Sequence, residues 1–297
     1  MLFGLALFAG LMLLAPGHAR AQNGKPLSLN AEAMLLQDAE GKILLEKNAE
    51  ESHAPASLVK LMTLYVALKD LEAGRVVLEE PVTISPRAAW THPNRMGLRA
   101  GESVPFEVLL KGVAIASAND AATAIAEYLS GDEQHFVDRM NAEAEALGLT
   151  ATRFANPHGL PDPAQRSTAK DLATLAAKLL QDFPAAREFL GATSFVYRGK
   201  LYARRISLLK DPWGVEALKT GFTSEAGYNL VVAASRGGQS FVAVLLGAQS
   251  RRLSFRDAEK LLQYGFVQGG IEPPREERTT LPRRRGTRTR VVLPPPS

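Results

Sequence analysis

One apolar segment in the first quarter of the chain constrains the fold more than any other. Pro55 disfavours helical backbone at the residue before it and presets φ for a helix that begins near Ala56 or Ser57. From there to Lys69 almost every residue is apolar or a good helix former. A helix that is apolar nearly all round is buried, so the sequence predicts a core built around this segment.

Two residues break the apolar character of this helix. Ser57 and Lys60 are three positions apart and therefore share one helix face. Burial disfavours the charged form of a lysine and lets its amine act as a base. A serine in the first turn lies where free N–H groups and the helix dipole favour developing negative charge. These are the parts of an activated serine nucleophile, although the pair also fits a helix N-cap and a lysine that reaches the surface.

The composition is globular and excludes several kinds of site. The chain has 297 residues, 46% hydrophobic and 22% charged, enough for one large core and a small second domain. It has no cysteine, which excludes disulfides, thiol catalysis and zinc–thiolate sites. The histidines follow no metal-ligand spacing, so we expect no metal and no other cofactor.

The net charge of +4 arises from the C-terminal tail, where the arginines crowd, while the rest of the chain is near neutral or slightly acidic. A basic tail is weak evidence for nucleic-acid binding, and we expect no such partner. Residues 269–297 are rich in Pro, Arg and Thr, which predicts a disordered tail. The sequence leaves open whether this tail associates with a membrane.

The N-terminus predicts export. Residues Leu2 to Ala15 form an apolar run that is too short to span a bilayer comfortably. Ala19 and Ala21 then supply small residues at the two positions that a signal peptidase reads. We therefore expect cleavage after Ala21, with the mature protein in the periplasm or on the envelope side of the inner membrane.

The order of the expected elements predicts an α+β fold. Strands are expected in the hairpins 32–46 and 194–205 and in the strong pair 228–234 and 241–246. Helices are expected at about 57–69, 108–114, 119–129, 133–147, 168–182 and 253–264, and residues 71–105 are expected to be mostly loop. Strands at both ends with helices between them indicate a largely antiparallel sheet with helices on its faces.

Two further motifs carry polar chemistry. Lys219-Thr220-Gly221 stands just before the strong strand pair, where its glycine would let a strand edge approach a ligand. Its lysine and threonine together suit a carboxylate. Ser117-x-Asn119 precedes a helix and by itself is most simply a pair of caps. By itself, Lys219-Thr220-Gly221 also fits a turn at a strand edge.

The serine–lysine pair and these two motifs follow one another in the order found in class A β-lactamases and penicillin-binding proteins. From Leu29 to Val267 the sequence resembles the low-molecular-weight penicillin-binding proteins, D-alanyl-D-alanine carboxypeptidases of the serine peptidase S11 type. The segments that carry this resemblance are 55–63, 117–122, 146–149, 158–160, 219–223 and 226–230. It implies a β-lactamase/transpeptidase-like fold with a helical subdomain, and a division into signal peptide (1–21), catalytic domain (22–268) and tail (269–297).

The resemblance implies a role for each polar residue of the first two motifs. Ser57 would attack the peptide bond between two terminal D-alanines and form an acyl-enzyme, and Lys60 would take its proton. Ser117 would relay a proton to the departing D-alanine. Asn119 would hold Lys60 and the substrate amide. The implied partners are peptidoglycan stem peptides that end in D-Ala-D-Ala, and β-lactams that acylate the same serine.

The resemblance also implies how the substrate is held. Lys219 would supply positive potential, Thr220 would bind the terminal carboxylate, and the N–H groups of Ser57 and Phe222 would form the oxyanion hole. Phe222 stands where the family often has His, so side-chain contacts with the substrate can differ. Arg205 falls about where the family often has a carboxylate-binding arginine, although its neighbours differ.

Three other functions are compatible with the motifs. The first is D,D-endopeptidase activity on cross-links, which shorter, single-domain relatives have. The second is a β-lactamase, but the Glu-x-x-Leu-Asn loop of class A enzymes has no counterpart, because no Glu lies three residues before Leu29-Asn30. The third is a non-catalytic binding or sensor module on the same scaffold.

Overall fold

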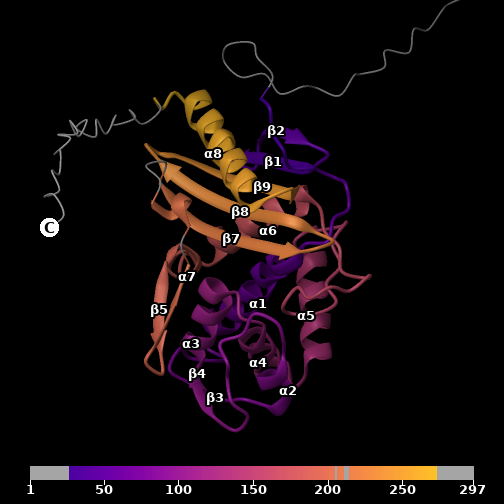
Figure 1. Ribbon diagram of the computed structural model, residues 1–297, viewed down its shortest axis with the longest axis vertical. Coiled ribbons are helices and arrows are strands. Elements are labelled where there is room, and N and C mark those ends of the chain that lie inside the picture. Colours follow the sequence, from indigo (N-terminus) through magenta and orange to yellow (C-terminus); the bar gives the residue numbers. More distant parts are fainter. Residues whose placement is uncertain (1–26, 205, 211–213, 273–297) are drawn as a thin grey trace, which may run out of the picture.

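A five-stranded antiparallel sheet forms the upper part of the molecule in Figure 1, with strand order β2-β1-β9-β8-β7. Its strands are β1 (Ala33–Asp38), β2 (Ile43–Lys47), β7 (Val215–Thr223), β8 (Gly227–Arg236) and β9 (Gln239–Ala248). The computed structural model describes residues 27–204, 206–210 and 214–272. The expected signal peptide, Arg205 and the tail beyond residue 272 lie outside these described residues. Because β7 is an edge strand, one row of its backbone groups is open to a ligand.

Helices cover both faces of the sheet. Helix α8 (Arg251–Gln268) packs on one face, and α1 (Lys60–Glu72) and α6 (Ala169–Asp182) lie on the other. Side chains of a strand alternate between faces, so Val231 joins the α1/α6 core while Leu230 and Val232 join the α8 core. Each such side chain, fully buried, stabilises the fold by about 1.5–3 kcal/mol.

The lower part of the molecule is mainly helical (Figure 1). Its elements are η1 (Ala56–Val59), β3 (Pro81–Thr83), α2 (Pro86–Trp90), β4 (Ser103–Pro105), α3 (Phe106–Lys111), the π-helical η2 (Gly112–Ala116), α4 (Asn119–Ser130) and α5 (Glu133–Ala146). Helix α7 (Ala186–Gly191), the hairpin β5 (Ser194–Tyr197) to β6 (Lys200–Ala203) and η3 (Ser207–Lys210) connect this part to β7. Helix α1 lies between the two parts and packs on α4, α5 and α6.

Most expected elements are confirmed. Both hairpins, the strong strand pair and the helices expected near residues 57, 108, 119, 133, 168 and 253 are present, and α1 is buried from Lys60 to Leu68 as its apolar character predicts. The segment 71–105 is mostly loop as expected, and the short elements β3, α2 and β4 lie in it. Helix α7 was not expected. These elements are short and form through contacts with the rest of the molecule rather than through periodicity.

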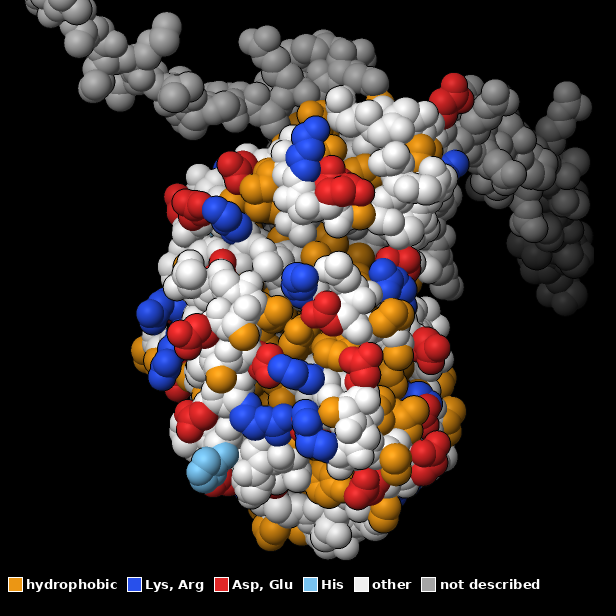
Figure 2. Space-filling view, turned by 180° about the vertical axis from the view of Figure 1, so that it is seen from behind, with side chains coloured by type: hydrophobic (Ala, Val, Ile, Leu, Met, Phe, Trp, Pro, Cys, Tyr) orange, Lys and Arg blue, Asp and Glu red, His pale blue; other side chains and the backbone are white. Residues whose placement is uncertain are grey.

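The face of the molecule that is turned away from the viewer in Figure 1 carries mixed charge. Figure 2 shows acidic and basic side chains interspersed on this face, with apolar side chains between them. Within the described ranges, no helix is both long and apolar enough to cross a bilayer. In the same part of the chain, no three His, Asp or Glu side chains come together as ligands for a metal ion.

Candidate active site

Ser57 lies on a tight turn at the beginning of the buried helix. The 3-10 turn Ala56–Val59 leads directly into α1. Ala56 has a φ of 50°, a left-handed conformation that costs a non-glycine residue about 1 kcal/mol or more. The helical turn between Ser57 and Lys60 brings the Lys60 Nζ to 3.2 Å from the Ser57 Oγ.

Three oxygen atoms surround the fully buried amine of Lys60. It contacts the Ser57 Oγ, the Asn119 Oδ1 at 2.7 Å and the backbone oxygen of His158. Burial holds the pKa of Lys60 well below its usual value of 10.5, and the nearby Lys219 lowers it further. A neutral amine has two N–H groups, which the two carbonyl oxygens accept. In this neutral form the lone pair is left for the Ser57 hydroxyl 3.2 Å away, which is the arrangement of a base beside a nucleophile.

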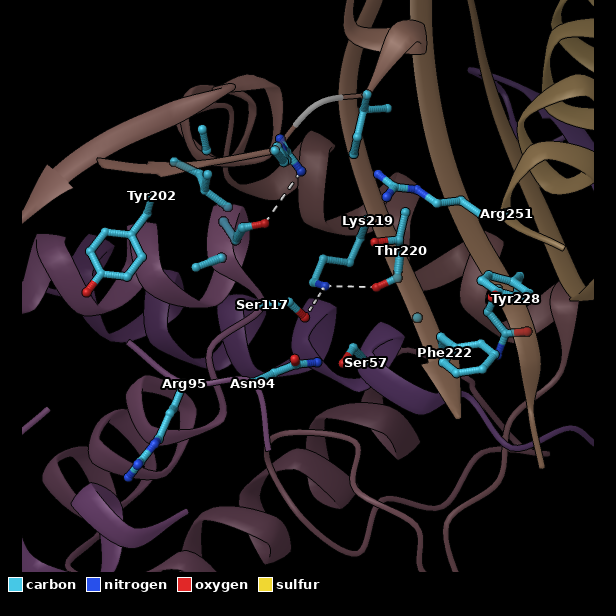
Figure 3. A pocket seen from close by; sticks show the side chains of 18 of the residues that line it. Ser57, Asn94, Arg95, Ser117, Tyr202, Lys219, Thr220, Phe222, Tyr228 and Arg251 are labelled. Atoms are coloured by element: carbon cyan, nitrogen blue, oxygen red, sulfur yellow. Dashed lines mark hydrogen bonds between the residues drawn. The ribbon is translucent and has the colours of Figure 1, made fainter. Parts of the chain in front are cut away.

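Ser117 and Lys219 form a second pair across the cleft. Ser117 follows the π-helical η2 and has a φ of 54°, so a strained residue presents its hydroxyl here as well. The Lys219 Nζ donates to the Ser117 Oγ at 2.8 Å and to the Thr220 backbone oxygen at 2.9 Å (Figure 3). Burial, together with the charge of Arg204, lowers the pKa of Lys219 to about 7.

Gly221 allows β7 to approach the serine turn. A Cβ atom at this position would lie 3.1 Å from the Ser57 backbone nitrogen and 3.0 Å from the Pro55 oxygen, tighter than an ordinary contact. The Lys219-Thr220-Gly221 tripeptide lies inside the edge strand β7 and not in a turn that precedes a strand. The edge of β7 and the start of α1 form one continuous wall of the site.

A loop behind Ser57 holds the lysine from the other side. Gly159 has a φ of 85°, and a Cβ atom there would lie 2.0 Å from the Ala56 backbone oxygen. The Gly159 N–H donates to the Asn156 Oδ1 at 2.7 Å, which fixes the loop so that the His158 carbonyl faces Lys60. Residues 158–160 carried part of the family resemblance, but only the folded structure shows their contact with the amine.

Asp120 organises the opposite wall, and the motifs gave no sign of it beyond its place after Asn119. Its buried carboxylate accepts three consecutive backbone N–H groups, from Met96 at 2.9 Å, Gly97 at 2.8 Å and Leu98 at 3.1 Å. The Asn119 side chain donates to the Pro93 oxygen at 2.5 Å. This wall and the serine helix are thus fixed by adjacent residues of one motif.

These groups open into a cleft of about 650 Å³ (Figure 3). Among the described residues that line it, five are cationic and none is acidic: Arg95, Lys200, Arg204, Lys219 and Arg251. Such a cleft attracts an anionic ligand. In Figure 3 the Arg251 side chain, from the first residue of α8, points toward Thr220. The sequence did not single out Arg251, because it lies beyond every segment that carries the family resemblance.

The arginine expected to bind a carboxylate, Arg205, lies outside the described residues. Its neighbour Arg204 is directed inward. The Arg204 guanidinium donates to the backbone oxygens of Ala192 and Leu218, each at 2.8 Å, and to that of Leu190. Burial lowers its pKa to about 10. Arg204 therefore fixes the wall of the cleft and adds positive potential beside Lys219.

Of the residues expected in the site, Ser57, Lys60 and Asn119 form one hydrogen-bonded group, and Ser117 and Lys219 form a second. Ser57, Ser117 and Lys219 line one cleft. Thr220, Gly221 and Phe222 line the same cleft. The alternative that Ser57 is only a helix cap is not supported, since the 3-10 turn that contains it has no side-chain cap. The alternative that Lys60 reaches the surface is wrong, because its side chain is fully buried.

Known proteins are similar to this chain in sequence and in fold. The family model of peptidase S11, described as D-alanyl-D-alanine carboxypeptidase, matches residues 20–250. D-alanyl-D-alanine carboxypeptidase DacC of Escherichia coli strain K12 is 40% identical over 268 residues, which are 87% of this chain and 67% of that protein.

Solved structures of penicillin-binding proteins have a similar fold. Penicillin binding protein 5 from Haemophilus influenzae superposes with a TM-score of 0.79 at 34% identity, over 82% of this chain and 72% of that one. Penicillin-Binding Protein D2 from Listeria monocytogenes, in its ampicillin-bound form, superposes with a TM-score of 0.75 at 30% identity, over 82% of this chain and 100% of that one. The α+β, penicillin-binding-protein-like fold is thereby confirmed. The chain belongs to peptidase family S11, the D-alanyl-D-alanine carboxypeptidases.

Proposed function

We propose that this protein is an exported serine D,D-carboxypeptidase that removes the terminal D-alanine from peptidoglycan stem peptides through an acyl-enzyme on Ser57. The observation that carries the proposal is the buried Lys60 amine, held by two carbonyl oxygens and placed 3.2 Å from the Ser57 Oγ. A base with a lowered pKa beside a hydroxyl is what serine acylation at neutral pH requires.

This geometry supports the following course for the reaction. The Ser57 Oγ attacks the carbonyl carbon of the penultimate residue while Lys60 takes the hydroxyl proton. The N–H groups of Ser57 and Phe222 stabilise the oxyanion, since Gly221 packs β7 directly against the serine turn. Ser117, hydrogen-bonded to Lys219, gives its proton to the departing amine and receives in turn the proton that Lys60 took from Ser57. Free D-alanine leaves, and water then releases the shortened peptide from Ser57.

The terminal carboxylate of the substrate lies at the cationic end of the cleft. Thr220 offers a hydroxyl there, Lys219 offers positive potential, and Arg251 points toward Thr220. A charge-assisted hydrogen bond to a carboxylate is about twice as strong as a neutral one. The requirement for a free carboxylate explains why such an enzyme would act on the end of a peptide.

Binding of this carboxylate is expected to weaken above neutral pH. The pKa of Lys219 is about 7, below its usual value, so the amine is charged at acidic pH and loses its charge as the pH rises through 7. We expect KM for a D-Ala-D-Ala peptide to rise about tenfold between pH 6.5 and 9, equivalent to about 1.4 kcal/mol, as a charged hydrogen bond becomes a neutral one. The Lys219→Met variant should show a high KM at every pH. A wild-type KM that stays constant to pH 9 would contradict this role.

β-Lactams are expected to acylate Ser57, because they present a reactive carbonyl and a carboxylate to the same groups. The relative from Listeria monocytogenes was solved with ampicillin bound. Release of the penicilloyl group should be slow, since the sequence lacks the class A Glu-x-x-Leu-Asn loop.

We also propose that residues 1–21 are a signal peptide and that residues 22–268 are the catalytic domain. The product would then be released on the envelope side of the inner membrane.

The test uses a pentapeptide that ends in D-Ala-D-Ala, fluorescent penicillin and purified sacculi. We expect free D-alanine from the peptide and one penicilloyl adduct per chain by mass spectrometry, both lost in Ser57→Ala. On sacculi, free D-alanine supports carboxypeptidase activity, whereas monomerised muropeptides would indicate the endopeptidase. Rapid turnover of penicillin would indicate a β-lactamase. A covalent adduct on Ser57→Ala would overturn the assignment of the nucleophile.

A further inference from the structure

Two aromatic rings form an exposed platform at one end of the cleft. Phe222 on β7 and Tyr228 on β8 are register partners, and their ring centroids lie 4.4 Å apart at an interplanar angle of 34°. Phe222 is 53% exposed, although it is a large apolar side chain. Both residues line the same cleft as Ser57 (Figure 3).

The fold does not need these rings for its core. Neither Phe222 nor Tyr228 belongs to the apolar core on either face of the sheet. Five cationic residues also line the cleft, but the platform itself offers aromatic faces. An apolar surface beside a reactive serine is suited to an uncharged part of a ligand, which it can remove from water.

Given the proposed function, the position of the platform identifies the part of the substrate that contacts the two rings. The terminal carboxylate lies at Thr220, and the scissile carbonyl lies at the N–H groups of Ser57 and Phe222. Thr220 and Phe222 are two residues apart on one strand, so their side chains lie on the same side of β7. A substrate bound along this edge therefore runs from its carboxylate toward the platform. What lies beyond the scissile carbonyl is the acyl part of the peptide.

We propose that Phe222 and Tyr228 form a specificity subsite for the side chain of the residue that precedes D-Ala-D-Ala, and that they select a chain of several methylene groups. The rings remove those methylenes from water, whereas a single methyl group at the same position buries much less apolar area. Phe222 contributes in two ways: its backbone N–H serves the reaction, and its ring serves selection.

The experiment compares two tripeptides, Nα,Nε-diacetyl-L-Lys-D-Ala-D-Ala and Nα-acetyl-L-Ala-D-Ala-D-Ala, which differ only in this side chain. We expect wild type to prefer the lysine peptide about thirtyfold in kcat/KM, within the range that apolar pockets give for a few methylene groups. In Phe222→Ala this ratio should fall below about threefold. Phe222→Leu, which keeps part of the apolar surface, should give an intermediate ratio.

Leu201 provides the matched control. It is also exposed in the cleft, but it comes from the β6 hairpin and not from the platform. Leu201→Ala should keep the thirtyfold ratio. A ratio that is unchanged in Phe222→Ala, or that falls equally in Leu201→Ala, would overturn the subsite.

A binding measurement separates this inference from the proposed function. Calorimetry with Ser57→Ala should give a lower Kd for the lysine peptide than for the alanine peptide, and Phe222→Ala in that background should remove the difference. If wild type releases D-alanine from neither peptide, the proposed function fails, and the ratio of the two Kd values still decides the subsite. Equal Kd values in Ser57→Ala would overturn it.

Discussion

Replacing Lys60 with methionine is expected to lower the rate of Ser57 acylation by about 10²–10⁴-fold, the usual contribution of a general base. Methionine has a similar length and no charge, so it fills the space without accepting the serine proton. The Ser57 Oγ would lose the amine that lies 3.2 Å away. Acylation is measured as the second-order rate constant for a chromogenic β-lactam.

The Lys60→Met variant should still fold. Two buried acceptors, the Asn119 side-chain oxygen and the His158 backbone oxygen, lose their donor, at about 1–3 kcal/mol each. Removing an amine whose burial already lowers its pKa offsets part of that cost. Lys69→Met is the matched control, since Lys69 lies on the same helix in a surface ion pair with Glu143 at 2.6 Å. Acylation of Lys60→Met within tenfold of wild type would show that another group is the base.

Replacing Gly159 with alanine is expected to reduce acylation about 10²-fold and to destabilise the protein by about 2–4 kcal/mol. The new Cβ atom would lie 2.0 Å from the Ala56 backbone oxygen, so the loop or the serine turn must move. Either movement shifts the His158 carbonyl from Lys60 or turns Ser57 away from its base. A displacement of about 1 Å is enough for such a loss of rate.

Gly148→Ala separates this clash from backbone strain. Gly148 also has a positive φ, 73°, but a Cβ atom there meets nothing within 4 Å. The Gly148→Ala variant should lose about 1 kcal/mol of stability from backbone strain alone and keep the wild-type rate of acylation. Chemical denaturation and β-lactam acylation measure both effects. Equal rates for Gly159→Ala and Gly148→Ala would show that the loop does not position the reacting pair.

The polar residues of the site were predictable because each stands in a short motif with a chemical purpose. Ser57 and Lys60 are adjacent on one helix face, so local geometry alone joins them. The sequence also indicated that Lys219 and Gly221 belong to a strand edge near a ligand. It did not show that Gly221 packs on the Ser57 nitrogen, because that contact joins residues more than 160 positions apart.

Other parts of the site carry no local signal. Arg251 opens a helix that the sequence predicts only as a cover for the sheet, and its direction toward Thr220 follows from how α8 packs. Asp120 stands in the sequence only as the residue after Asn119, yet its carboxylate holds three N–H groups of a loop more than twenty residues away. The expected signal peptide, Arg205 and the tail beyond residue 272 lie outside the described residues and remain predictions.

The sequence by itself determined the fold class and the buried helix, and it predicts which side chains react, because periodicity and short motifs act over a few residues. Only the tertiary structure decided the state of those side chains. The amine of Lys60 is buried and held by two carbonyl oxygens from distant segments, and Lys219 is buried beside Arg204. Desolvation and neighbouring charge set the pKa of a lysine, and both depend on which segments the folded chain packs around it.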